Sequence, residues 1–188
     1  MHMLIRDSID LLEATTRPAK LETTPLPYAE KDLEPVMSRA TIDYHYENLA
    51  KNYAKRYNAG KGNADFNRAG SCLHNMFFPQ FRAPKAPNRP KGSSLQLIEK
   101  NFDDFDAFKD EIKKVFMSIQ GSGWVYLSTA GEIKTIKNHA VRTDIALLID
   151  AWEHAWSLDY QADKDQYLDN IWRIINWEII NERIGVIS

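Results

Sequence analysis

The sequence has 188 residues, which is enough for one domain or two small lobes with a sizeable buried core. Its 24 basic and 26 acidic side chains leave a net charge of −2, which argues against a globally basic nucleic-acid-binding protein. The single cysteine, Cys72, excludes an internal disulfide framework and fits a reducing compartment, the cytoplasm. No apolar run reaches the roughly 18 residues that a membrane span needs.

The first half of the chain is expected to be helical after an N-terminal extension, residues 1–24. Within the extension, residues 4–12 carry a short amphipathic pattern, which the following threonines and prolines interrupt. Ser38 is a plausible N-cap for a long helix that runs to about residue 57, where an Asn-Ala-Gly-Lys-Gly string ends it. A second helix is predicted over residues 65–78.

A proline-rich stretch, residues 79–94, marks the boundary between two lobes, 25–88 and 89–188. The second lobe begins with a helical repeat over residues 94–120. After a Gly-Ser-Gly string, alternation predicts a β-hairpin of residues 124–128 and 133–137, with a third strand near 146–149. A closing helix is predicted over residues 167–184. Helices followed by a small antiparallel sheet and a helix indicate an α+β fold.

Four residues whose side chains can bind a metal ion are spread along these predicted elements. His45 and His74 lie in the two predicted N-terminal helices, and Asp150 and His154 lie four residues apart in the second lobe. If the backbone is helical there, this spacing would let the side chains of Asp150 and His154 point to the same place. Three imidazoles and one carboxylate suit Mn, Fe, Zn or Cu, and are too rich in nitrogen for Mg or Ca.

Each of these residues taken alone has a more ordinary interpretation. A histidine in an apolar helix is more often a hydrogen-bonded core residue than a ligand, and Asp150 is also a candidate helix cap. The aromatic side chains are mainly expected in the core. Cys72, two residues before His74, is a weak basis for a thiolate site, and a small inert cysteine is the favoured interpretation.

Five strings, taken in order, resemble the iron/manganese superoxide dismutase family, and the resemblance covers about residues 25–184. The strings are Leu26-Pro27-Tyr28, Gly121-Ser122-Gly123-Trp124, Asp150-Ala151-Trp152-Glu153-His154-Ala155, Leu158-Asp159-Tyr160-Gln161 and the segment Tyr167-Leu168-Asp169-Asn170-Ile171-Trp172-Arg173-Ile174-Ile175-Asn176-Trp177-Glu178. The resemblance implies an N-terminal helical hairpin lobe followed by an α/β lobe with a three-stranded antiparallel sheet. It also implies disproportionation of superoxide to O2 and H2O2.

The resemblance implies one Fe or Mn ion per subunit, cycling between +3 and +2. By position, its ligands are His45, His74, Asp150 and His154, with one solvent molecule added. Two ligands come from each lobe. This agrees with the separate observation that two helical histidines precede the proline-rich stretch and that the Asp/His pair follows it.

The resemblance also implies residues around the ion. Tyr53 corresponds to a gateway tyrosine, and His139 takes the catalytic position beside the bound solvent, although a loop histidine bonded to backbone is the alternative. The wall that keeps the site dry corresponds to three aromatic residues: Phe78, Trp124 and Trp152. Gly70 together with His139 resembles archaeal-type or metal-tolerant members, which favours iron, with manganese or dual use as the alternative.

A homodimer is implied, with a tetramer as the alternative assembly. Glu153 corresponds to a glutamate that crosses the dimer interface to the partner's metal-ligand histidine. Leu49 and Ser157 stand where many members carry a His/Tyr pair, and Asn48 replaces a lysine at the channel mouth. We therefore expect a rebuilt channel and weaker electrostatic steering of the superoxide anion than in typical members.

Two other functions compete with the dismutase. A zinc hydrolase would use the same three nitrogen ligands and one oxygen ligand (N3O), with zinc-bound hydroxide as the nucleophile. It is disfavoured because no second carboxylate is positioned as a base and the expected wall is aromatic. A non-catalytic family member is the other competitor, and the presence of all four implied ligands argues against it.

Overall fold

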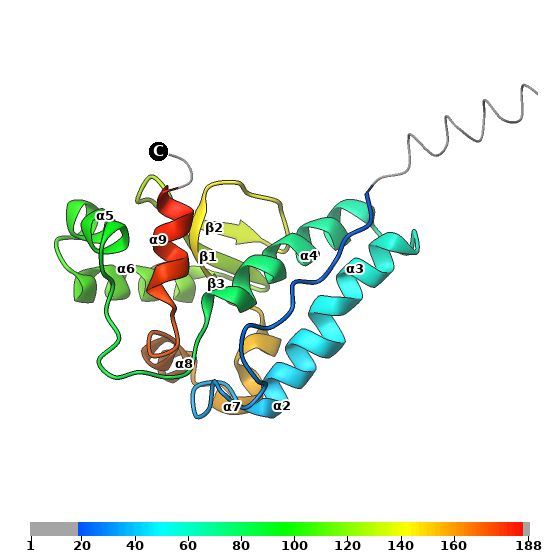
Figure 1. Cartoon of the computed structure of the whole chain (residues 1–188), viewed down its shortest axis with the longest axis horizontal. Coiled ribbons are helices and arrows are strands. Elements are labelled where there is room, and N and C mark those ends of the chain that lie inside the picture. The colour runs from blue at the N-terminus through cyan, green and yellow to red at the C-terminus, as the bar shows by residue number, and fades with distance from the viewer. Residues whose placement is uncertain (1–18, 186–188) are drawn as a thin grey trace, which may run out of the picture.

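The computed structural model describes residues 19–185, so the amphipathic pattern at residues 4–12 lies outside the described part of the chain. A pair of long helices forms one side of the molecule, and a sheet with further helices forms the other (Figure 1). The sheet is contacted by a helix of the pair as well as by the later helices, so one apolar core is shared between the two sides.

The first long helix is a continuous rod with a π-helical middle. It comprises α2 (Arg39–Ile42), the π-helix η1 (Asp43–Ala50) and α3 (Lys51–Asn58). The predicted N-cap is confirmed, because Ser38 Oγ accepts a hydrogen bond from the backbone N–H of Thr41. The predicted helix is confirmed too, but the π turn, which is common at functional sites, was not predicted. His45 lies in that turn.

The second long helix, α4 (Ala64–Phe77), packs along α3 and ends in the 3-10 turn η2 (Phe78–Gln80). Its N-cap is Asn63, whose side chain accepts from the backbone N–H of Phe66. Residues 19–24 form an extended segment that lies along both helices (Figure 1), where its backbone bonds to the side chains of Asn58 and Asn75.

Two predicted single helices are wrong, because each is broken in the middle. Residues 94–120 form α5 (Ser93–Phe102) and α6 (Phe105–Ser118). Asp103 adopts φ 67° between them, and Asp104 caps α6 by accepting from the N–H of Ala107. Residues 167–184 form the end of α8 (Lys164–Ile171) and α9 (Trp177–Gly185), and between them the N–H of Asn176 donates to the carbonyl of Gln80.

The three-stranded antiparallel sheet is confirmed. It consists of β1 (Gly123–Ser128), β2 (Ile133–Lys137) and β3 (Ile145–Asp150) in the order β2-β1-β3. The second glycine of the Gly-Ser-Gly string allows close pairing, since a Cβ on Gly123 would lie 2.7 Å from the carbonyl oxygen of Ile136. After β3 the chain forms η3 (Glu153–Ala155) and α7 (Ser157–Tyr160). Every residue of β1 and β3 is buried.

This arrangement is the predicted α+β fold, with helices first and the antiparallel sheet second. Among residues 19–185, no helix is both long and apolar enough to span a membrane.

Candidate metal centre

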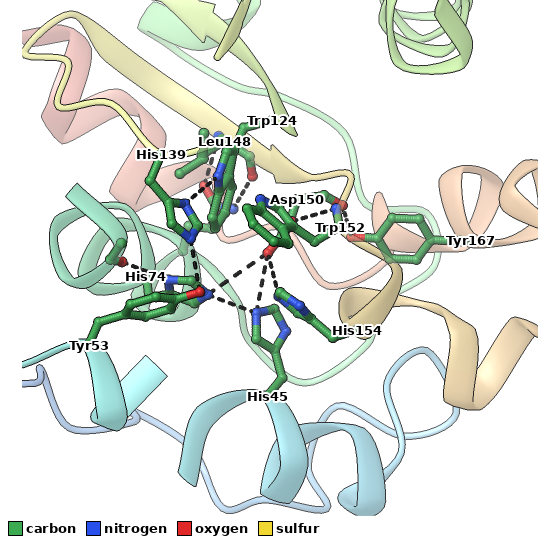
Figure 2. A network of polar contacts seen from close by, with 12 residues as sticks. His45, Tyr53, His74, Trp124, His139, Leu148, Asp150, Trp152, His154 and Tyr167 are labelled. Carbon is green, nitrogen blue, oxygen red and sulfur yellow. Dashed lines mark hydrogen bonds and ion pairs between the residues drawn. The ribbon is translucent and has the colours of Figure 1, made fainter. Parts of the chain in front are cut away.

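Four side chains from four elements converge at the junction between the helix pair and the sheet (Figure 2). The π segment η1 supplies His45, α4 supplies His74, the end of β3 supplies Asp150, and η3 supplies His154. One ligand atom from each lies within 4.8 Å of the others, and within the described residues these are the only four grouped in this way. All four were candidate ligands on the basis of the sequence.

The separations are those of atoms turned toward one centre. Nε2 of His45 lies 3.1 Å from Nε2 of His74 and 3.2 Å from Oδ2 of Asp150. The same Oδ2 lies 3.4 Å from Nε2 of His154 and 4.0 Å from Nε2 of His74. Asp150 is fully buried, as are His45 and, almost entirely, His74.

The spacing of Asp150 and His154 works differently from the helical case considered above. Asp150 ends an extended strand, and Trp152 is also extended before the 3-10 turn that carries His154. The backbone N–H of Trp152 donates to Oδ1 of Asp150 at 2.8 Å, which fixes the carboxylate and leaves Oδ2 facing the imidazoles. The two side chains therefore meet across a tight turn.

The protonation states suit metal binding. Burial lowers the pKa of His45 to about 4 and the pKa of His74 well below its ordinary value, so both rings are neutral at pH 7. Burial by itself raises the pKa of Asp150, but the contacts with His154 and His45 outweigh it and hold that pKa below its ordinary value. Neutral imidazoles and an ionised carboxylate are the states in which these groups bind metal.

The unsatisfied atoms test whether an ion fits. Among the described residues, Oδ2 of Asp150 and Nε2 of His154 are buried without a hydrogen-bond partner. Nδ1 of His74 lies 2.6 Å from the carbonyl oxygen of Gly70, so this nitrogen carries the proton and Nε2 presents a lone pair to the centre. A buried carboxylate beside lone pairs is costly without a cation. The donor set, three nitrogens and one oxygen, fits iron or manganese.

His139 and Tyr53 form a second layer beside the cluster (Figure 2). The indole N–H of Trp124 donates to Nδ1 of His139 at 3.2 Å, and Nε2 of His139 lies 2.9 Å from the hydroxyl of Tyr53. Both contacts are to side chains rather than to the backbone. Gly70 allows Tyr53 to lie this close to α4, since a Cβ on it would lie 2.8 Å from the tyrosine ring.

Aromatic rings surround the four side chains. The ring centroid of Phe78 lies 4.9 Å from that of His45, and Trp124 lies 5.1 Å from His74. Trp152 stacks on His154 at 5.5 Å and on His139 at 4.7 Å. The three aromatic residues named from the sequence are thus all at the cluster.

Phe66 and Tyr167 also belong to this environment and were missed. The ring of Phe66 lies 4.6 Å from that of His139, and the hydroxyl of Tyr167 donates to the backbone carbonyl of Asp150 at 3.3 Å. A signal for Phe66 was present, because it stands four residues before Gly70 and eight before His74, on one face of a helix. The contact of Tyr167 spans two elements and leaves no local pattern.

The residues expected at an interface all keep some exposure to solvent. Glu153 is exposed and Leu49 and Ser157 are half-buried. An open cavity of about 450 Å³ is lined by His154, Glu153, Ser157 and Lys164, among others. Two apolar side chains, Tyr44 and Leu158, are 44% and 56% exposed.

The fold and the buried N3O cluster define a class of mononuclear metalloprotein, and sequence comparison identifies the family. The family model for iron/manganese superoxide dismutases, C-terminal domain, matches residues 90–183. The chain therefore belongs to the iron/manganese superoxide dismutase family.

Full-length relatives agree with this assignment. An iron superoxide dismutase of Bacteroides fragilis is 34% identical over 190 residues, covering 87% of this chain and 98% of the relative. A Mn/Fe superoxide dismutase of Porphyromonas gingivalis is 34% identical, covering 86% and 98%. An iron superoxide dismutase of Pyrobaculum aerophilum is 30% identical, covering 85% and 90%. These matches cover most of the chain and are not confined to the C-terminal domain.

Proposed function

We propose that the chain is a superoxide dismutase in which His45, His74, Asp150 and His154 hold one iron or manganese ion. The observation that carries this proposal is the convergence of four ligand atoms within 4.8 Å, in a chain of this family. When bound, the ion would supply reversible one-electron chemistry, so that two superoxide anions and two protons give O2 and H2O2. Nothing found in the comparisons supports a zinc hydrolase or a non-catalytic role.

The ligands set the charge of the site. Two neutral buried imidazoles and the carboxylate of Asp150 present one negative charge to the ion. Phe78 and Trp124 pack against the ligand rings, which keeps bulk water away and strengthens the electrostatic interactions inside. The ion and a small anion can therefore interact without competing solvent.

Tyr53 and His139 are the residues placed to supply a proton to the reduced substrate. Burial raises the pKa of Tyr53 to about 12, so its phenol remains protonated at neutral pH, and it lies beside the ligand His74 with a ring separation of 5.3 Å. His139 holds the phenol oxygen in place through Nε2. Tyr53 is thus positioned to donate a hydrogen bond to an anion at the centre, and it is the candidate proton donor.

The assembly and location are parts of the proposal as well. Two ligands from each side of the boundary near residue 88 make the site depend on both lobes. The exposed Glu153 beside His154, with Tyr44 and Leu158 nearby, supports a homodimer in which each Glu153 reaches the partner's ligand histidine. A cytoplasmic location fits the single cysteine.

We also propose that iron is the preferred ion. Gly70 and His139 together support iron, and the relatives above are named as iron or Mn/Fe enzymes.

The test is reconstitution of metal-free protein with iron and with manganese separately, followed by assay of superoxide decay. Iron is expected to restore activity at a stoichiometry of one per chain, and His74→Ala is expected to abolish it. Activity with manganese alone would overturn the iron preference. Full activity of His74→Ala would overturn the ligand assignment.

A further inference from the structure

The strand that carries Asp150 is an edge strand whose free side is closed by side chains. β1 pairs with only one side of β3. On the other side, the carbonyl of Ala146 accepts from Nη1 of Arg183 at 3.0 Å. The backbone N–H of Leu148 donates to Oε1 of Gln80 at 3.1 Å, and its carbonyl accepts from the same amide. Side chains thus do what a neighbouring strand would do.

Arg183 also reaches the helix that carries His74. Its Nη2 donates to the carbonyl of Met76 at 2.6 Å, near the end of α4, while its Nη1 bonds β3 and, at 3.2 Å, Oε1 of Gln80. Met76 is two residues after His74. One guanidinium on α9 therefore ties together the two elements that carry a histidine and the carboxylate of the centre.

An arginine suits this position for geometric reasons. The α4 ladder cannot continue past Pro79, which has no N–H, and the last carbonyls of a helix need other donors. A planar guanidinium offers several N–H groups in a fixed fork, whereas the N–H groups of an ammonium all lie on one nitrogen atom. A cation is also favoured at a helix C-terminus.

The partners of this guanidinium are all neutral. Among residues 19–185, Arg183 makes no ion pair with a carboxylate, and its side-chain hydrogen bonds go to two backbone carbonyls and one amide oxygen. Burial lowers its pKa to about 10, so it still carries its charge at neutral pH. Its contribution is therefore the relative placement of α4 and β3 rather than neutralisation of an acid.

We propose that Arg183 is a positioning residue for the metal centre: with the amide of Gln80, it joins the end of α4 to the free edge of β3 and so sets the separation of His74 and Asp150. This inference rests on the proposed function, because it requires those two residues to be ligands.

Three variants separate the contributions. Arg183→Met removes the fork and the charge, Arg183→Lys keeps the charge but can reach only one of the two elements, and Gln80→Met removes the amide with little change in volume. Arg173→Met is the matched control, because Nη1 of Arg173 bonds Asn170 within its own turn and none of its side-chain bonds reaches α4 or β3.

The measurements on iron-loaded full-length protein are iron affinity by chelator competition and the electron paramagnetic resonance spectrum of the ferric ion. We expect Arg183→Met and Gln80→Met to lose about 10- to 100-fold in affinity and to change the spectrum, as residues that orient ligands do. Arg183→Lys should give a smaller effect of the same kind. Arg173→Met should leave both readouts at wild-type values.

A purely structural role gives another pattern. If Arg183→Met and Gln80→Met only lower the melting temperature and keep the wild-type spectrum and affinity, the inference is wrong. Should Arg183→Met not fold, Arg183→Lys and Gln80→Met decide the question by the same readouts. Failure of the proposed function is distinguishable, because the wild-type chain would then bind neither iron nor manganese at the four residues.

Discussion

His139 has one arrangement of its ring proton that satisfies both neighbours. The indole N–H of Trp124 can only donate, so Nδ1 of His139 accepts and carries no proton. The proton of the neutral ring is then on Nε2, which donates to the hydroxyl oxygen of Tyr53. The phenolic proton of Tyr53 is left to point toward the ligand cluster.

Replacing His139 with Leu keeps bulk at this position but removes both hydrogen bonds. We expect kcat for superoxide to fall by about 10- to 100-fold, the range for residues that support a metal site from outside its ligands. Metal content should remain at one ion per chain, because no proposed ligand is changed. Pulse radiolysis and elemental analysis give the two numbers, and an unchanged kcat would remove His139 from the mechanism.

Replacing Gly70 tests the position of the Tyr53 ring separately from its hydrogen bond to His139. An alanine Cβ would lie 2.8 Å from ring atoms of Tyr53, so the ring has to move away from α4. We expect Gly70→Ala to lose activity while retaining metal and fold, since helix propensity favours Ala over Gly by about 1 kcal/mol. Ala69→Gly, at the neighbouring buried position, is the control for propensity alone. Wild-type activity in Gly70→Ala would show that the close approach has no functional role.

At the scale of elements, the break between α5 and α6 depends on a single cap. Asp104→Ala removes the acceptor for the N–H of Ala107 and should cost about 1 kcal/mol of unfolding free energy. Asp110→Ala, at an exposed position inside α6, removes the same charge and should change the free energy by less than about 0.5 kcal/mol. Equal losses in urea unfolding would contradict the capping role.

The helix breaks show which parts of the fold were predictable. The strands, the Ser38 N-cap and the N-terminal helices carry local patterns, and these predictions are confirmed. The apolar repeat continues through Asp103 and Asp104, so periodicity alone merged two helices. The break before α9 depends on the pairing of Asn176 with Gln80, about a hundred residues away, which no local pattern reports.

The candidate site divides in the same way. Asp150 and His154 were named because they stand in a string typical of a family, and His45 and His74 because they are histidines in predicted helices at positions that match the family's ligands. The contacts that orient them, such as Tyr167 with Asp150 and Arg183 with Met76, join distant segments through backbone carbonyls. A carbonyl has no residue identity, so such contacts cannot be read from the sequence.

For the whole molecule, metal binding should be linked to stability, because the four proposed ligands join the helix pair to the sheet. An ion that binds only the folded state, and whose free concentration is about 1,000 times its dissociation constant, adds about 4 kcal/mol to the free energy of unfolding. We expect chelation to lower the melting temperature and re-addition of iron to restore it. His74→Ala should show no such response, and an equal response in that variant would place the bound ion elsewhere.

The uncharged residue at the expected channel mouth gives a prediction for the rate of encounter between the enzyme and superoxide. Asn48 is uncharged, and Lys164 lies over the ring of Trp156 at 5.2 Å. We expect kcat/KM to fall only weakly with rising ionic strength, because Asn48 supplies no positive charge at the expected channel mouth. Asn48→Lys should steepen the dependence. A steep dependence in the unmodified enzyme would contradict the weak-steering hypothesis.

Anomalous X-ray scattering from crystals of the active protein, at the iron and manganese absorption edges, tests the proposed metal site directly. We predict one peak per chain, enclosed by Nε2 of His45, His74 and His154 and by Oδ2 of Asp150, with the stronger signal at the iron edge. A fully active preparation with no peak among these four atoms would contradict the assignment of the metal site to these residues.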